Sequence, residues 1–239
     1  MNPIITIAKK ELRDTFYSPI AYVFTTVFLF LSFWLFLSNL LPTGQATLRL
    51  LFVWVPILFL IFLPSITMGK WSEEKKTGTQ EILLTLPVKD IEVILGKFFS
   101  ALLFVIFNLV LLLTIWITVA LLGDVDHGPV IGGIIGLILI ASACISIGLF
   151  ISSCTENQII AFILTTVMLF ILYLAGEPLA LDYIPEFAKP LISYTSLSSH
   201  FASMARGVID SRDIIYYLSV TGFFLFLNLL SLESRKWNE

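Results

Sequence analysis

The chain has 239 residues, of which 58% are hydrophobic and 13% are charged, and its formal net charge is −3. Soluble domains carry about 25% charged residues, so this composition excludes an ordinary water-soluble fold and indicates that lipid surrounds much of the chain. The small net charge gives no indication of nucleic-acid binding. The two cysteines, Cys144 and Cys154, fit neither a disulfide framework nor a metal site.

Six stretches without Asp, Glu, Lys or Arg approach the roughly 20 apolar residues that a spanning helix needs. We place these spans at residues 20–41, 50–68, 98–122, 130–152, 159–175 and 214–232. The second contains Pro56 and Pro64, so we expect it to be kinked. The first apolar run is too long for a signal peptide and has no cleavage pattern, so we expect it to be retained.

Residues 3–17 precede the first span and have an amphipathic pattern. Ile4, Ile5, Ala8, Leu12 and Phe16 share one face of a helix, whereas Lys9, Lys10, Arg13 and Asp14 lie on the other. Such a helix is suited to the cytoplasmic membrane interface, and Ser18-Pro19 is expected to end it. A simple positively charged topology anchor is the alternative interpretation.

The loop between the second and third spans, residues 70–97, has its own helical signals. After a mixed-charge run at residues 73–76, Thr77 and Gln80 are spaced as a capping box. Residues 80–86 then form about two helical turns, which Pro87 ends. Asp90 is expected to cap the helix that continues into the third span. The four large apolar residues of the short helix need a cover, which is either a partner protein or lipid headgroups and neighbouring spans.

Residues 177–212 lie between the fifth and sixth spans and are too long for a simple turn. The pattern of Leu197, Phe201, Met204 and Ala205 predicts a short amphipathic helix that Gly207 ends. This segment lies on or dips into the outer membrane surface, or it forms a lid on the outer ends of the spans. We interpret His200 in this helix, and His127 in the preceding outer turn, as solvated or interfacial.

Counts of lysine and arginine predict the orientation. With the N-terminus in the cytoplasm, ten of these residues fall inside and four outside, so the positive-inside rule places both termini in the cytoplasm. An even number of spans agrees. The inside residues are Lys9, Lys10, Arg13, Lys70, Lys75, Lys76, Lys89, Lys97, Arg235 and Lys236, and the outside residues are Arg49, Lys189, Arg206 and Arg212.

Motifs for catalysis are missing from the sequence. Gly96-Lys97 is followed by Phe98, so it is not a nucleotide-binding P-loop, and neither a metalloprotease nor a serine-hydrolase motif occurs. The spans carry no ionisable residue of the kind that marks proton or ion pathways. Small residues of the fourth span, including Gly132 and Gly136, predict close helix packing within the chain or at a subunit interface. These features favour a non-catalytic membrane subunit.

The cytoplasmic loop resembles that of a known family. Residues 73–88, EEKKTGTQEILLTLPV, followed by residues 94–97, ILGK, are similar to the loop motif of ABC-2-type transporter permeases. The resemblance extends over the chain and includes Lys10-Glu11-Leu12 and the Ser18-Pro19 turn. Residues 156–162, with 199–201 and 206–213, resemble the gliding-motility-associated permeases within the family. Related permeases, including one for nitrous-oxide reductase maturation, share the loop motif.

The resemblance implies an all-α integral membrane protein that forms one transmembrane domain over residues 1–239. It has six transmembrane helices, an N-terminal amphipathic interfacial helix, a cytoplasmic coupling helix and an extracytoplasmic helical segment before the last span. Two permeases pair, as two copies or as paralogues, in the bacterial inner membrane. A separate ATP-binding subunit carries ATP and Mg, and this chain holds no cofactor. An auxiliary membrane subunit and membrane lipid are further candidate partners.

Particular residues follow from the resemblance. Residues 80–86 correspond to the coupling helix and residues 3–17 to the connecting helix, with Lys9, Lys10 and Arg13. The residues that the resemblance assigns to the interface with the ATP-binding subunit are Glu73, Glu74, Thr79, Glu81, Leu83, Leu84, Leu86 and Pro87. The predicted function is an ABC transporter permease, with export by alternating access. The alternative is a membrane scaffold or signalling subunit that binds a cytoplasmic ATPase without moving a substrate.

Overall fold

The computed structural model describes residues 3–43, 49–79, 88–122, 127–182 and 185–236. Within these ranges every regular element is an α-helix. The helices are α1 (Pro3–Tyr17), α2 (Pro19–Thr43), α3 (Arg49–Thr67), α4 (Gly69–Thr77), α6 (Asp90–Leu122), α7 (His127–Cys154), α8 (Gln158–Leu174), α9 (Pro178–Leu181), α10 (Lys189–Thr195), α11 (Leu197–Met204) and α12 (Ser211–Lys236).

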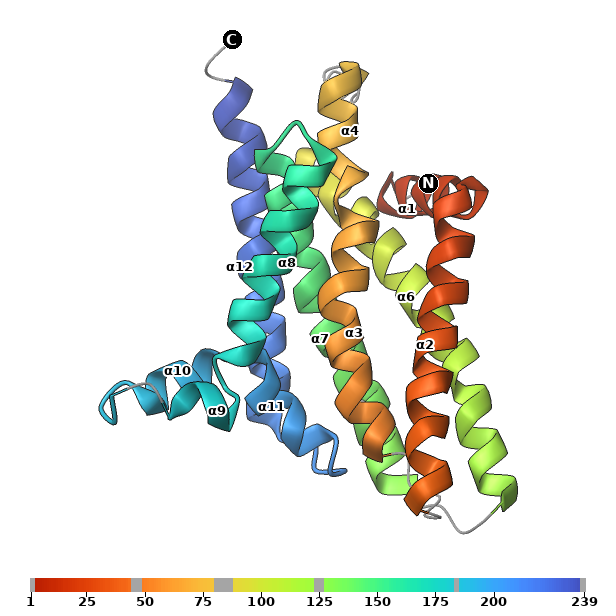
Figure 1. Ribbon diagram of the computed structural model, residues 1–239. Helices are drawn as coiled ribbons and strands as arrows, with labels where there is room; N and C mark the ends of the chain where they lie inside the picture. Colours follow the sequence, from red (N-terminus) through yellow and green to blue (C-terminus); the bar gives the residue numbers. More distant parts are fainter. Residues whose placement is uncertain (1–2, 44–48, 80–87, 123–126, 183–184, 237–239) are drawn as a thin grey trace.

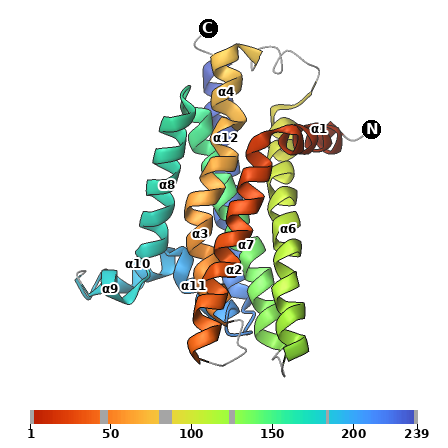
Figure 2. The same ribbon diagram turned by 45° about the vertical axis from the view of Figure 1, so that its right-hand side comes forward.

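The long helices form an elongated bundle in which α2, α3, α6, α7, α8 and α12 run alternately in opposite directions (Figures 1 and 2). The start of α1, the end of α12 and the whole of α4 lie at one end, which we call the α1–α4 end. Helices α9, α10 and α11 lie toward the other end, the α9–α11 end. Five of the lysines expected inside the cell belong to α1 or α4 at the α1–α4 end: Lys9, Lys10, Lys70, Lys75 and Lys76.

Five helical stretches among the described residues are long and apolar enough to cross a membrane: Pro19–Ser38, Leu51–Thr77, Asp90–Leu121, His127–Cys154 and Ser211–Ser234. The fifth of the six expected spans, α8, is equally apolar but has only 17 residues. At 1.5 Å per residue it is about 25 Å long, somewhat short of a hydrocarbon core of about 30 Å. The chain is therefore a multi-pass membrane protein with at least five candidate spans.

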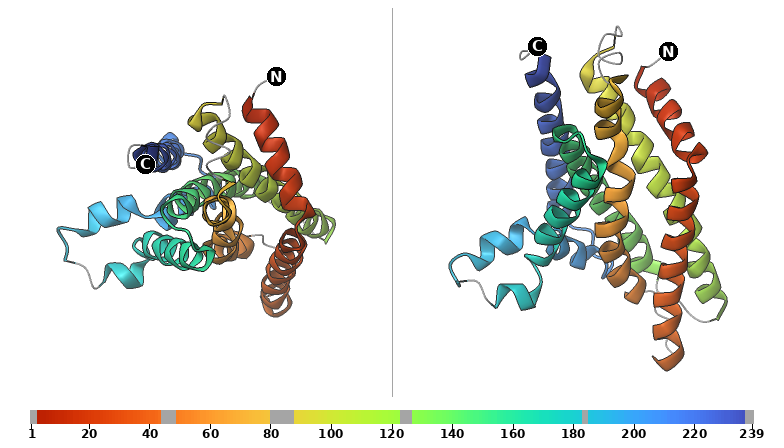
Figure 3. Two further views of the ribbon diagram at one scale, coloured as in Figure 1. Left: turned by 90° about the horizontal axis from the view of Figure 1, so that it is seen from above. Right: turned by 45° about the horizontal axis from the view of Figure 1, so that its top comes forward.

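Helix α7 occupies the centre of the bundle (Figure 3). Its apolar stretch is 72% buried, against 22–56% for the other four candidate spans. Glycines allow its neighbours to approach closely: a Cβ atom at Gly133 would overlap the Phe52 ring of α3, and one at Gly148 would overlap Thr67. These small residues of the fourth predicted span therefore serve packing within the chain.

Helix α1 lies across the bundle and packs on α6. Gly96 permits the crossing, because a Cβ atom there would lie 2.5 Å from Ile7 Cγ2. Phe16 makes edge contacts with Phe104 and Phe107 of α6, with ring centroids 5.4 and 5.3 Å apart. Helix α6 thus covers much of the apolar face of α1, which we expected to lie in the membrane interface. Ile5 belongs to the same face, but it is 65% exposed and α6 does not cover it.

The segment before α12 contains α9, α10 and α11, and α11 is the helix expected near Leu197–Ala205. Ser196 caps it by accepting a hydrogen bond from Ser198 N at 3.2 Å, and Gly207 follows it with a φ of 86°. Its Phe201 and Met204 are buried, and a Cβ atom at Gly136 of α7 would lie 2.9 Å from the Phe201 ring. Helix α11 therefore packs on the ends of the bundle helices, as in the lid alternative.

Our interpretation of His200 as a solvated or interfacial residue was wrong. The residue is only 8% exposed, and its Nδ1 lies 2.7 Å from Asp213 Oδ1 while its Nε2 lies 2.9 Å from the Tyr194 carbonyl oxygen. The Tyr216 ring stacks on the imidazole at a centroid distance of 3.9 Å. His200 thus joins α10 and α11 to the first turn of α12, an arrangement that helix periodicity alone does not reveal.

A methyl group added at Gly96 tests the contact between α1 and α6. We expect Gly96→Ala to lower the unfolding free energy by about 1–3 kcal/mol, because overpacking displaces Ile7 or the helix that carries it. The measurement is the Tm of the purified chain in detergent. Gly222→Ala is the matched control, since a Cβ atom there meets nothing within 4 Å. Equal Tm changes in both variants would contradict this packing.

Candidate functional site

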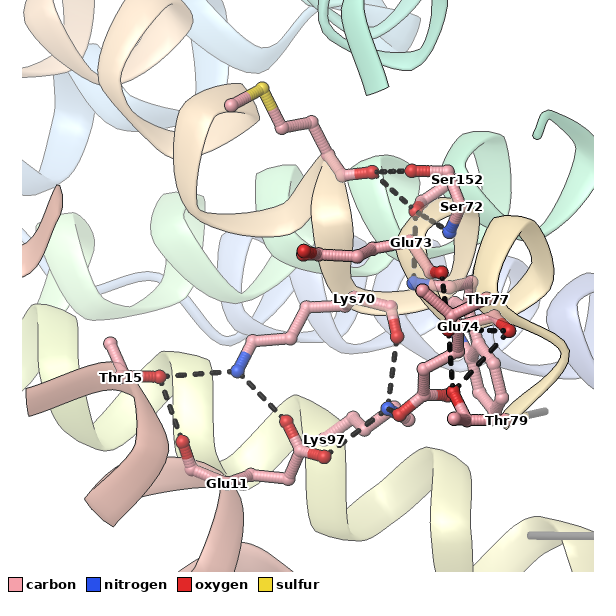
Figure 4. Close-up of polar contacts among 12 residues, drawn as sticks. Glu11, Thr15, Lys70, Ser72, Glu73, Glu74, Thr77, Thr79, Lys97 and Ser152 are labelled. Carbon is pink, nitrogen blue, oxygen red and sulfur yellow. Dashed lines mark hydrogen bonds and ion pairs between the residues drawn. The ribbon is translucent and has the colours of Figure 1, made fainter. Parts of the chain in front are cut away.

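Four charged side chains from three helices meet at the α1–α4 end (Figure 4). Glu11 of α1 binds both Lys70 of α4, at 3.0 Å, and Lys97 of α6, at 3.2 Å. Lys97 also binds Glu74 of α4, at 2.5 Å. We call this set of four residues the charged joint. It connects segments that lie up to 86 positions apart in the sequence.

Lys97 lies at the centre of the charged joint and is 1% exposed. Its ammonium group donates to Glu11, to Glu74 and to the Lys70 carbonyl oxygen, the last at 2.9 Å. These bonds use all three N–H donors of a lysine. The Trp71 ring completes the surroundings, with its centroid 4.8 Å from Nζ. An unpaired ammonium in such a place would cost several kcal/mol, so Lys97 requires α1 and α4 to be in position.

Glu11 is the acidic counterpart and is also buried. Burial by itself raises the pKa of its carboxyl group, but the charges and hydrogen bonds of Lys97 and Lys70 outweigh burial and lower this pKa to about 2. Glu11 therefore carries a negative charge throughout the physiological pH range. Thr15, one helical turn later, gives Lys70 a second acceptor at 3.2 Å and donates to the Glu11 carbonyl oxygen.

The charged joint continues into the centre of the bundle through α7. Ser152 Oγ of α7 accepts hydrogen bonds from Trp71 N and Ser72 N, both at 3.2 Å, and donates to the Met68 carbonyl oxygen at 2.8 Å. It thus inserts into the backbone ladder where α3 passes into α4, a known cause of helix bending. Lys75 of α4 also donates to the Ser153 carbonyl oxygen. Helix α4 is therefore fixed to α7 as well as to α1 and α6.

The start of the predicted loop differs from our expectation. Residues 69–77 form α4, and Thr77 is its last residue. Gly78 follows in the left-handed conformation, with a φ of 72°. Thr77 Oγ1 donates back to the Glu73 carbonyl oxygen at 2.9 Å. The left-handed glycine ends α4 directly after Thr77, and Gln80, the other member of the expected capping box, lies outside the described residues.

The structure describes only part of the predicted ATPase interface. Glu74 lies in the charged joint, whereas Glu73 is exposed and forms no ion pair with any described residue. Thr79 is exposed and its hydroxyl lies 2.9 Å from that of Thr77. Outside the described residues lie the rest of the predicted interface and the coupling helix that carries it: Glu81, Leu83, Leu84, Leu86 and Pro87.

The three basic residues assigned to the connecting helix are all on α1. Lys9, Lys10 and Arg13 are exposed on the side that α6 does not cover, and the Arg13 guanidinium lies 5.2 Å from the centroid of the Tyr17 ring. They do not take part in the charged joint. They remain available to a partner or to lipid at the α1–α4 end.

Sequence reasoning missed Glu11, Lys70 and Lys97 as site residues. One signal was present: Glu11 falls three residues after Ala8 and directly before Leu12, within the apolar face of α1. A charged residue at a buried helix position needs a partner. Which lysines supply that partner depends on how α1 crosses α4 and α6, and a single sequence does not specify this.

The ion pairs of the charged joint hold α1, α4 and α6 together. No group of three or more His, Cys, Asp or Glu that could hold a metal ion occurs among the described residues. The joint connects the first helix, the helix that leads toward residues 80–87 and the helix that follows them. Through Ser152 and Ser153, α4 is also bonded to α7.

Comparison with known proteins adds one match. The sequence model of the family described as ABC-2 family transporter protein matches residues 20–234 of the chain. A comparison with curated proteins finds no match.

Replacement of Lys97 tests the charged joint. Lys97→Met removes one of the two cations of the buried Glu11 carboxylate and the cation of the partly buried Glu74, so we expect a loss of about 3–5 kcal/mol in the free energy of unfolding. Thermal unfolding of the purified chain in detergent measures it. Lys76→Met is the matched control, because Lys76 lies on the same helical segment as Glu74 and is exposed. A Tm loss no larger than that of the control would refute the role of Lys97.

The depressed pKa of Glu11 predicts a dependence of stability on acid. The ionised carboxylate stabilises the fold fully above about pH 4.5, and this contribution disappears as the pH falls toward about 2, because protonation then neutralises the partner of two lysines. Glu11→Gln should therefore flatten the decrease of Tm between pH 4.5 and 2. Glu186→Gln, at a carboxylate with 95% of its side chain exposed, should leave the decrease unchanged. A Glu11→Gln profile parallel to the original would be evidence against the assignment.

Proposed function

Because the chain belongs to the ABC-2 family of transporter proteins and is an ABC transporter permease, we propose that it exports its substrate by alternating access. A separate ATP-binding subunit drives the change. The observation that carries the proposal is the charged joint, which unites the helices on both sides of residues 80–87. Its members Glu11, Glu74 and Lys97 come from three sequence segments that resemble the family.

The proposed mechanism is a mechanical linkage. Residues 80–86 act as the coupling helix, and Leu83, Leu84 and Leu86 occupy a cleft on the ATP-binding subunit. ATP and Mg are bound by that subunit, and their binding draws two such subunits together. The displacement enters α4 and α6 at their ends nearest residues 80–87. Through Glu11 and Lys97 it moves α1 with them, so the helices turn as one body.

The orientation in the membrane follows from charge. We place the α1–α4 end in the cytoplasm of a bacterial cell, with α12 ending on the same side and the inner membrane as the location. The exposed Lys9, Lys10 and Arg13 support this side, because cytoplasmic segments carry the excess of basic residues. The α9–α11 end then faces the exterior, and its packed helices form the extracytoplasmic lid.

We further propose that α8 is the sixth span and that two permeases pair. Helix α8 is apolar and runs antiparallel to α7 along the bundle (Figure 1), and a seventeen-residue helix is at the lower limit of spanning lengths. The second permease is another copy of the chain or a paralogue. The similarity of residues 156–162 to gliding-motility-associated permeases favours a transporter of that kind.

Substitutions in the coupling helix test this function. We expect Glu81→Ala with Leu84→Asp to weaken co-purification with the ATP-binding subunit about tenfold or more, as for loss of interface anchors. Transport-linked ATP hydrolysis should fall in parallel. The matched control is Leu191→Asp, at a leucine that is 71% exposed on α10 at the opposite end.

The scaffold alternative gives a different result. A scaffold would lose the ATP-binding subunit on the same substitution but would show no substrate-stimulated ATP hydrolysis in the original chain. Unchanged complex formation and unchanged hydrolysis in the double variant would remove residues 80–86 from the mechanism.

A further inference from the structure

A cavity of about 210 Å³ lies beside the charged joint, where the elbow between α1 and α2 meets the junction of α3 and α4 and the first residue of α8. It is smaller than the pockets of about 300–1,000 Å³ that hold drug-sized ligands. It therefore suits a small polar group better than a whole amphiphile. Its position near the end of the bundle is where a bilayer places lipid headgroups.

The lining of this cavity changes from polar to apolar. Thr15, Ser18, Lys70 and Gln158 contribute hydroxyl, ammonium and amide groups. Ala21, Phe24 and Phe104 form a deeply buried apolar part of the lining, at 4%, 5% and 1% exposure. Such a gradient matches the boundary between the headgroup and the acyl chains of a lipid.

Two donors in the cavity have hydrogen-bonding capacity left. The Lys70 ammonium has three N–H groups, and its partners among the described residues are Glu11 and Thr15. The Gln158 side-chain amide makes no hydrogen bond with any described residue. Its nitrogen lies near Gly69, 3.6 Å from the position of a Cβ atom there. Both donors suit a phosphate oxygen.

The acidic member of the lining is Asp14, at the mouth of the cavity. Its side chain is exposed and forms no ion pair with any described residue. Lys70 is already neutralised by Glu11, so Asp14 leaves the lining without an excess of positive charge. A ligand with a net negative charge is therefore disfavoured, and one that combines a phosphate with an amine fits both signs.

We propose that this cavity binds the headgroup of a zwitterionic aminophospholipid. The phosphate accepts hydrogen bonds from Lys70 and Gln158, and the primary ammonium donates to Asp14. The acyl chains leave past Ile20, which is 57% exposed at the mouth on α2. The lipid thus lies against the residues that join α1 to the rest of the bundle. This inference requires a membrane protein but no particular direction of transport.

Native mass spectrometry of the full, delipidated chain tests the site. Dioleoyl-phosphatidylethanolamine, -phosphatidylcholine and -phosphatidylglycerol are added in competition, and the ratio of their one-to-one adducts is measured. Because the ratio comes from one sample, it does not depend on how much protein is folded. We expect the ethanolamine lipid to dominate, since a quaternary ammonium donates no hydrogen bond and phosphatidylglycerol carries a net negative charge.

Two variants locate the binding. Asp14→Asn should reduce the preference for the ethanolamine lipid over the choline lipid about tenfold, the loss expected for one charge-assisted hydrogen bond. Ile20→Trp should block the mouth and reduce the ethanolamine adduct by a similar factor. Val23→Trp is the matched control, because Val23 is 62% exposed on the same helix and does not line the cavity.

Several results would overturn the proposal. Equal binding of the three lipids, or stronger binding of phosphatidylglycerol, would refute the headgroup assignment. An ethanolamine adduct that survives Ile20→Trp as well as it survives Val23→Trp would place the lipid elsewhere. A preference that is unchanged by Asp14→Asn would remove Asp14 from the site. None of these measurements depends on the ATP-binding subunit, so they are independent of the test of transport.

Discussion

The ammonium group of Lys97 is the constraint around which the α1–α4 end is organised. It lies at 1% exposure with Glu11, Glu74 and a carbonyl oxygen as acceptors. A charge can occupy such a position only if every donor is satisfied. The positions of α1, α4 and α6 are therefore mutually dependent, and Gly96 beside it allows α1 close enough for Glu11 to reach. In a permease that an ATP-binding subunit drives, this mutual dependence is useful. If α1, α4 and α6 could shift independently, a movement of the coupling helix would not reach the rest of the bundle.

The opposite end uses a different kind of contact. There His200 bonds to Asp213 and to the Tyr194 carbonyl oxygen, and the Tyr216 ring covers it. Buried aromatic and hydroxyl groups, including those of Tyr217 and Ser198, connect α11 to α12 and to the end of α8. Between the two ends the contacts are mainly apolar, with α7 at their centre. Polar contacts thus connect the helices at the two ends of the bundle, and apolar packing connects them in between.

The sequence predicted local structure well and distant contacts poorly. Ser18-Pro19 and Gly207 end α1 and α11 because each acts on its own backbone, and hydrophobic length is a local property that located five of the candidate spans. Glu11 and Lys97 are 86 positions apart, and His200 and Asp213 lie on different helices. Their pairing depends on how the helices cross, which periodicity does not determine. The sequence also did not show that Thr77 ends α4, because this depends on the left-handed conformation of Gly78.

The serine of α7 at the junction of α3 and α4 has a broader consequence. In an uninterrupted helix the angle between successive turns is determined by the peptide chain itself, but here one hydroxyl group of a different helix supplies the acceptor for Trp71 N and Ser72 N. The direction of α4 is therefore set by α7. A tilt of α4 would therefore break these two hydrogen bonds unless α7, the most enclosed helix of the bundle, moved with it.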